Sequence, residues 1–180
     1  MKKLSLFLIL FSSYFLIQAQ PLITRTGHIS FFSRIPLENI KAENKQVNAA
    51  INLSKQNIAF TALLKGFLFE KALMQEHFNE NYVESHLYPK TSFTGSYNGN
   101  VNLDENGTYN ILVKGNLTLH GITRGIEVPA VMEVRNGKLT GKTNFKIKPA
   151  DYNIKIPAVV KDKIPQQIDV AVTISFDIQK

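Results

Sequence analysis

The residues best suited to chemistry gather in one short stretch, EHFNENYVESH. It holds Glu76, Glu80 and Glu84 together with His77 and His86, two of the four histidines of the chain. Carboxylates and imidazoles bind metal ions, and they also serve as general acids and bases. The stretch therefore raises two hypotheses, a metal centre and an acid/base active site.

A metal centre has little support in the surrounding sequence. His77 and Glu80 would share a face if the stretch is helical, because they are three residues apart. Carboxylate-bridged metal sites need further ligands from other helices, and no second helix is indicated in this chain. The HExxH pattern of zinc proteases is also absent. We expect the glutamates to face solvent, His77 to contact a neighbouring loop, and no metal or other cofactor to be bound.

Other catalytic arrangements are equally weak. His120 lies in LHGIT at the end of a strand pattern, no GxSxG elbow is present, and the chain has no Cys, which excludes thiol catalysis. A pair of carboxylates for sugar hydrolysis stays open, because their separation is a three-dimensional property. The sequence predicts no catalytic residue and no enzyme. An enzyme using the segment from Glu76 to His86 is kept as the alternative.

The first nineteen residues, MKKLSLFLILFSSYFLIQA, have the pattern of a secretory signal peptide. Two lysines precede an apolar stretch of about fourteen residues, which is short for a membrane span of roughly 20 residues. Ala19 supplies the small residue before a cleavage site. The sequence predicts a signal peptide at 1–19, one mature domain at 20–180, and a periplasmic or secreted location.

The composition narrows the partners of this domain. The formal net charge of the 180-residue chain is +7, and its Lys and Arg residues are scattered rather than gathered in a block. Nucleic-acid binding is therefore not expected. A mild positive charge is compatible with transient contact with an anionic membrane surface.

Alternation of apolar and polar residues is the strongest structural signal. It runs through TYNILVKGNLTL and through IDVAVTISFDI, which predicts long strands with one dry face. Turn signals such as Asn136-Gly137 favour antiparallel hairpins. We expect an all-β fold, a single extended antiparallel β-barrel of about eight strands, since closure removes exposed edges. The other expected strands are 28–33, 38–44, 47–53, 57–64, 91–98, 127–134, 138–148 and 153–156.

One short α-helix is expected, at about 70–81. Met74, Phe78 and Tyr82 recur every four residues and form an apolar stripe that would pack against the barrel. The EHFNENYVESH stretch lies on this helix and on the loop after it. Its apolar side is therefore expected to matter more than its acids.

Several segments resemble the YceI-like, polyisoprenoid-binding family of secreted bacterial proteins. The strongest is GNLTLHGITRGIEVP, with EHF and YPKTSFTG before it and FKIKPADYNIKIP after it. The resemblance implies a lipocalin-like barrel whose apolar tunnel binds a polyisoprenoid or a similar long-chain, fatty-acid-like lipid, and implies a homodimer by analogy. The usual N-terminal pattern lacks its Trp here, and Pro149 and Asn153 stand where Arg and Gly are common, which leaves the lipid's identity open.

Inward-facing apolar residues are the candidate lipid-binding positions. A filled barrel, in a structural module of the cell envelope, is the alternative that the sequence leaves open. Phe67, Phe69 and Phe78 are expected to cluster where the helix borders the barrel. The predicted tunnel-lining residues are Phe60, Phe93, Tyr109, Val113, Leu117, Leu119, Phe145 and Ile147.

Overall fold

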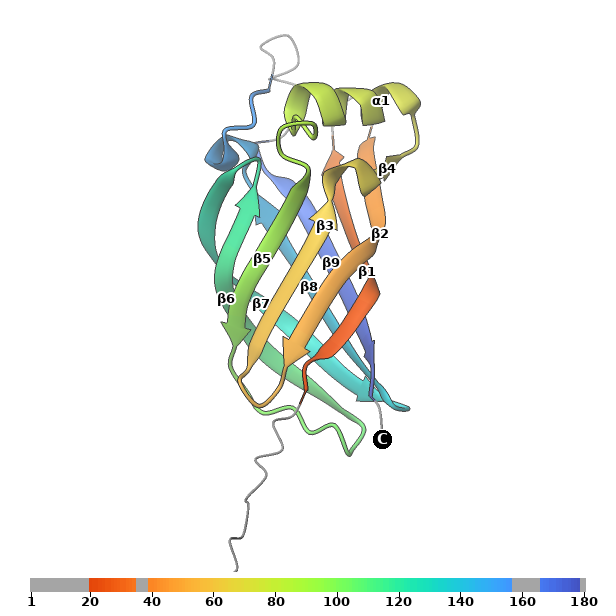
Figure 1. Ribbon diagram of the computed structural model, residues 1–180, viewed down its shortest axis with the longest axis vertical. Coiled ribbons are helices and arrows are strands. Elements are labelled where there is room, and N and C mark those ends of the chain that lie inside the picture. Colours follow the sequence, from red (N-terminus) through yellow and green to blue (C-terminus); the bar gives the residue numbers. More distant parts are fainter. Residues whose placement is uncertain (1–19, 35–38, 157–165, 179–180) are drawn as a thin grey trace, which may run out of the picture.

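The computed structural model of the 180-residue chain describes residues 20–34, 39–156 and 166–178. The predicted signal peptide at 1–19 lies outside these residues. Most of the described chain is β-structure (Figure 1).

The strands form one antiparallel sheet that closes on itself, as the sequence predicts. The order is β1-β9-β8-β7-β6-β5-β3-β2-β4, and β1 also pairs with β2, so that eight strands make a barrel. The two-residue β4 pairs with β2 at Ala42 and Glu43, beyond the part of β2 that pairs with β3. Closure gives β1 a neighbour on both edges. The strands are β1 (Leu22–Arg34), β2 (Asn39–Asn52), β3 (Asn57–Leu63), β4 (Leu68–Phe69), β5 (Lys90–Tyr97), β6 (Gly107–Leu119), β7 (Ile122–Arg135), β8 (Lys138–Ile147) and β9 (Ile168–Asp177).

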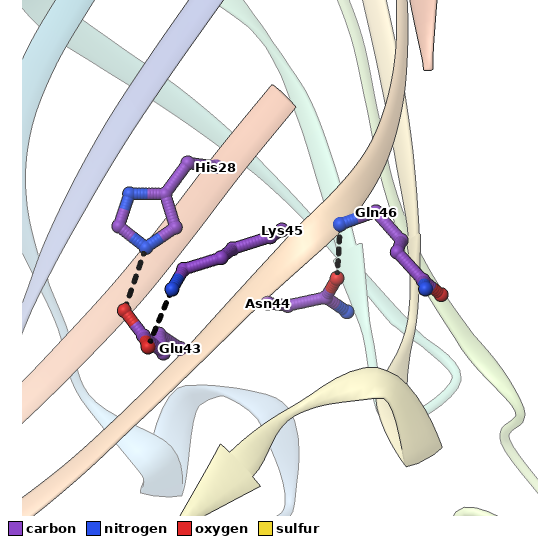
Figure 2. A network of polar contacts seen from close by, with 5 residues as sticks. All are labelled: His28, Glu43, Asn44, Lys45 and Gln46. Atoms are coloured by element: carbon purple, nitrogen blue, oxygen red, sulfur yellow. Dashed lines mark hydrogen bonds and ion pairs between the residues drawn. The ribbon is translucent and has the colours of Figure 1, made fainter. Parts of the chain in front are cut away.

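β2 is one continuous strand, whereas the sequence predicts two at 38–44 and 47–53. An extra residue in β2, between the pairs Ile29–Asn44 and Gly27–Val47, shifts the alternation by one position. The Asn44 side chain stabilises this bulge by accepting a hydrogen bond from the backbone N–H of Gln46 at 2.8 Å (Figure 2). It also donates to the carbonyl of Leu63 at 2.9 Å. In the sequence, this shift in the apolar–polar alternation resembles a boundary between two strands.

On the outer face of the same bulge, Glu43 contacts two basic side chains. Its carboxylate lies 3.0 Å from the Lys45 ammonium and 3.2 Å from the His28 ring (Figure 2). The hydrogen bond and charge of Lys45, with a smaller part from His28, lower the pKa of Glu43. The Glu43 side chain is partly exposed and lies on the outside of the barrel, so these contacts order the surface of the bulge rather than the core.

The expected strand at 153–156 is not formed. Pro149–Tyr152 make a short 3-10 helix, η3, and Asn153 ends it in the left-handed conformation with φ 57°. Proline at the first position starts such a turn, and Asn tolerates positive φ. The segment therefore turns across the end of the barrel instead of continuing β8.

Two tight turns join the central strands. Asn136 and Gly137 have φ of 51° and 74° and connect β7 to β8, which confirms the predicted hairpin turn. His120 and Gly121 have φ of 49° and 72° and connect β6 to β7 in the same way. Two-residue turns with positive φ match the twist of antiparallel strands.

The helical segment covers one end of the barrel (Figure 1). It comprises α1 (Ala72–His77) and a π-helical turn, η2 (Phe78–Tyr82), preceded by the short 3-10 turn η1 (Leu64–Gly66). The Phe78 ring lies 5.7 Å from Phe67 and 5.0 Å from Phe69, which confirms the expected cluster. Phe31 of β1 joins it, 5.5 Å from Phe78. Aromatic packing therefore attaches the helix to the barrel.

His120 ties three segments together at this end. It is 8% exposed; its Nδ1 donates to the Tyr152 carbonyl at 2.9 Å, and its Nε2 shares a hydrogen bond of 2.7 Å with the Glu84 carboxylate. The Tyr88 ring packs edge-on against it at 4.4 Å. The β6–β7 turn is thereby fixed to η3 and to the loop after the helix.

A pair of glycines shapes the barrel wall. Gly95 of β5 and Gly115 of β6 face each other, and the Phe93 ring lies over them. A Cβ on Gly115 would stand 2.4 Å from the Thr94 carbonyl oxygen and 2.6 Å from the ring. The missing side chains let Phe93 lie close to the wall, which leaves more of the interior open.

We expect Gly115→Ala to lower the free energy of unfolding by about 1–3 kcal/mol, because backbone and ring must both shift. Gly125→Ala in β7 is the matched control: its Cβ would meet only the Asn116 side chain, at 3.9 Å, and its effect should stay within about 0.5 kcal/mol. Urea unfolding of both variants measures the difference. Equal stability of the two variants would show that the close approach at Gly115 is not a constraint.

Candidate functional site

A cavity of about 320 Å³ lies inside the barrel beneath the helical segment. Pockets that bind small molecules begin at about this size. Its walls come from both sides of the barrel and from the helical segment above. The strands contribute residues such as Ile29, Phe31, Leu117, Leu119 and Val170, and the helical segment contributes Met74, His77, Phe78 and Tyr82.

A second, smaller cavity of about 60 Å³ continues along the barrel. Phe60, Phe145 and Val172 line both cavities, so the two meet at these three side chains. The order along β6 gives the direction: Leu119 and Leu117 line the larger cavity, and Val113 lines the smaller one. The interior therefore holds two apolar cavities in line along the barrel, with Phe60, Phe145 and Val172 between them.

Seven of the eight residues predicted from sequence lie on these cavities. Leu117, Leu119 and Ile147 line the larger one, Phe93 and Val113 line the smaller one, and Phe60 and Phe145 line both. The Phe60 and Phe93 rings stack with their centroids 5.3 Å apart.

Tyr109 is the exception, because it lines neither cavity. Its hydroxyl donates to the Asn102 carbonyl at 3.2 Å, and its ring lies beside Gly107 at the start of β6. The alternation places Tyr109 on the inner face of the strand, as expected. Tyr109 nevertheless lies near the start of β6, beyond the two cavities, where its side chain contacts the loop after β5.

The eight predicted lining residues include none from β1. Phe31 is the central ring of the aromatic cluster at the helix end of the cavity, and Ile29 and Ser33 lie beside it on the same face of β1. Alternation in HISFFSR would have identified all three. Val170 and Val172 of β9 also line this cavity. They lie on the apolar face predicted for that strand, but they are not among the eight predicted lining residues.

The lining of the larger cavity is almost uncharged. Among the described residues that line it, none is Lys, Arg, Asp or Glu, and His77 at its exposed margin is the one basic group. Burial raises the pKa of the Tyr82 phenol above its ordinary value, so this hydroxyl stays neutral. Such a cavity favours an apolar, uncharged guest.

The side chains of the EHFNENYVESH stretch lie apart from one another rather than in one metal-type cluster. In the described part of the chain, no three His, Asp or Glu side chains come together as a metal site would need. Glu76 and Glu80 are exposed, as expected. The Glu84 side chain is 40% exposed, and its carboxylate also shares a hydrogen bond with the buried His120, a contact that the sequence does not predict.

The apolar stripe expected in this stretch is confirmed. Met74, Phe78 and Tyr82 all line the larger cavity.

Within the described residues, no helix has the length and apolarity needed to cross a membrane.

Solved structures share this fold, and three of them are compared with the chain. They are a polyisoprenoid binding domain from Saccharophagus degradans (TM-score 0.72, 13% identity, 88% of this chain and 98% of that chain), Burkholderia cenocepacia BcnA (0.70, 15%, 83% and 95%) and the Campylobacter jejuni YCEI protein (0.65, 16%, 82% and 90%). At such low identities the likeness concerns the fold. No curated protein matches the chain.

A match to a sequence family decides the relationship. The model of the YceI-like domain matches residues 22–179, which include every strand of the barrel and the helical segment above the cavity. The chain therefore belongs to the family of YceI-like domains.

Proposed function

We propose that the protein binds a long-chain lipid, a polyisoprenoid or a similar amphiphile, in the apolar interior of its barrel. The observation that carries this proposal is the cavity of about 320 Å³ with its aromatic and aliphatic walls. The name of the Saccharophagus degradans relative, a polyisoprenoid binding domain, supports the same ligand class.

The shape of the interior suits such a chain. A flexible tail can pass Phe60, Phe145 and Val172 from the larger cavity into the smaller one. Each methylene-sized group moved from water into these walls contributes about 0.8 kcal/mol. Apolar walls recognise length and width rather than one chemical structure, so a family of related tails fits the proposal.

Binding is favoured over the two alternatives. A solid-core envelope module would fill its interior, whereas this barrel holds two cavities. An enzyme using the segment from Glu76 to His86 would need its acids and imidazoles to converge, but Glu84 pairs with His120 and the other acids point to solvent. We therefore propose a binding protein without catalytic residues.

Organic extraction of the purified protein, followed by mass spectrometry, tests the proposal. We expect a long-chain species to co-purify, and lipid-free protein to take up an added isoprenoid alcohol.

Val172→Trp would fill the space between the two cavities, so that part of the lipid tail loses its contact with the barrel wall. If only two methylene-sized groups of the tail lose this contact, binding weakens by about 1.6 kcal/mol, roughly tenfold.

Thr173→Trp is the matched control, because Thr173 lies next along β9 on the opposite face. It should bind lipid like the unmodified protein, and circular dichroism should show both variants folded. No co-purified lipid together with no uptake would contradict the proposal. Equal uptake by the two Trp variants would place the lipid outside the barrel.

We further propose that residues 1–19 direct export and that the mature protein acts in the periplasm or outside the cell. The apolar stretch before Ala19 supports this. Intact-mass measurement of protein recovered from the periplasm or medium should give a chain that begins at Gln20. A full-length chain recovered from the cytoplasm would argue against export.

Transient membrane contact at the helix end is proposed as the route of loading. Four leucines in or beside β3, β4, α1 and the loop after η2 are about 60% exposed, close to the segments that cover the larger cavity. Exposed apolar side chains near a cavity mouth can enter the lipid interface. The four are Leu63 (59%), Leu68 (61%), Leu73 (61%) and Leu87 (60%).

Replacement of these four leucines by Ser should slow lipid transfer from vesicles by about tenfold or more, since each inserted Leu contributes on the order of 1 kcal/mol. Ile23→Ser is the control, because Ile23 is 67% exposed at the start of β1, away from the helix. A fluorescent-lipid transfer assay measures the rates. Unchanged transfer by the Ser variant would exclude this route.

The homodimer implied by the family resemblance stays a prediction.

A further inference from the structure

One hydroxyl in the larger cavity has no partner. Ser33 is 2% exposed and lines the cavity, and its Oγ makes no hydrogen bond within the described structure. The other buried hydroxyl in the lining, that of Thr91, donates to the Thr118 carbonyl at 2.8 Å. Ser33 is therefore a buried polar group whose hydrogen-bonding capacity is free for a ligand.

No neighbouring side chain among the described residues accounts for this hydroxyl. Ser33 is paired in the sheet with Ile40, and Phe31 is the next inward residue along β1. A buried water needs two to four polar partners, roughly three on average, and the apolar lining offers few. A polar atom on the bound molecule would satisfy the hydroxyl more fully.

The surroundings also define the charge of that atom. A carboxylate or phosphate placed beside Ser33 would find no Lys or Arg among the described lining residues, and an unpaired buried charge is strongly unfavourable. A hydroxyl, carbonyl or ester oxygen needs only one hydrogen bond. The Ser33 hydroxyl can donate to a carbonyl or ester oxygen, and it can also accept from a ligand hydroxyl.

We propose that Ser33 receives the uncharged, hydrogen-bonding head group of the lipid, so that the head lies inside the barrel at the helix end. The tail then runs past Phe60, Phe145 and Val172 toward the smaller cavity. This inference rests on the proposed lipid-binding function and adds the ligand's chemical class and direction. It selects neutral alcohols, ketones, quinones or esters over ionised acids.

Three probes of matched tail test the inference: farnesol, the hydrocarbon farnesene and farnesoic acid. Displacement of a fluorescent lipid from the purified domain gives the Kd of each. The unmodified protein should bind farnesol about three- to tenfold more tightly than farnesene, the net value of one neutral hydrogen bond. Ionised farnesoic acid should bind more weakly than farnesol.

Ser33→Ala should bring the ratio of farnesene Kd to farnesol Kd to about one and leave the farnesene Kd unchanged. Ser30→Ala is the matched control, since Ser30 lies on the outer face of the same strand opposite Glu43, and it should keep the ratio. A ratio that survives Ser33→Ala, or farnesoic acid binding as tightly as farnesol, overturns the role of Ser33. Failure of both farnesol and farnesene to bind overturns the proposed function itself.

Discussion

Closure of one long antiparallel sheet around an incompletely filled interior is the constraint on which the rest of the structure depends. β1 pairs with β2 on one edge and with β9 on the other, which closes the eight-stranded barrel. A closed barrel must direct alternate side chains inward, and most of these are apolar. The glycine pair at Gly95 and Gly115 keeps the Phe93 ring close to the wall. The interior therefore remains partly open, although large side chains line it.

The polar stretch EHFNENYVESH has a structural role that its composition does not suggest. Phe78 packs on Phe31, Phe67 and Phe69, which holds the helical segment over the larger cavity. Glu84 then anchors the following loop to His120. The stretch thus forms the cover of the cavity, and its acids serve the surface and one buried contact rather than catalysis.

Much of the fold could be predicted because alternation and turn chemistry are local. β6 and β9 follow from period-two patterns, and the Asn136-Gly137 turn follows from residues that accept positive φ. The bulge in β2 was not predictable in this way, since the Asn44 side chain stabilises it through Leu63, on another strand. The His120–Glu84 pair joins residues far apart in sequence, and no local signal marks it.

The candidate site was predicted in part, for the same physical reason. Inward positions on β5, β6 and β8 were found by alternation, whereas the helix end of the cavity depends on how η1, α1 and η2 pack across the barrel. Tyr109 shows the limit of the pattern: it faces inward, yet its place along the barrel decides that it lines neither cavity. The period-two alternation of a strand shows whether a side chain faces the interior, but not where along the barrel axis it lies.

If a lipid tail occupies the barrel along its length, the end of that tail can be located by anomalous diffraction. Crystals of the protein would be loaded with a long-chain alcohol brominated at the tail end. We expect one bromine peak inside the barrel beyond Phe60, near Phe93 and Val113. A bromine peak on the outer surface, or filled cavities with no bound chain, would contradict it.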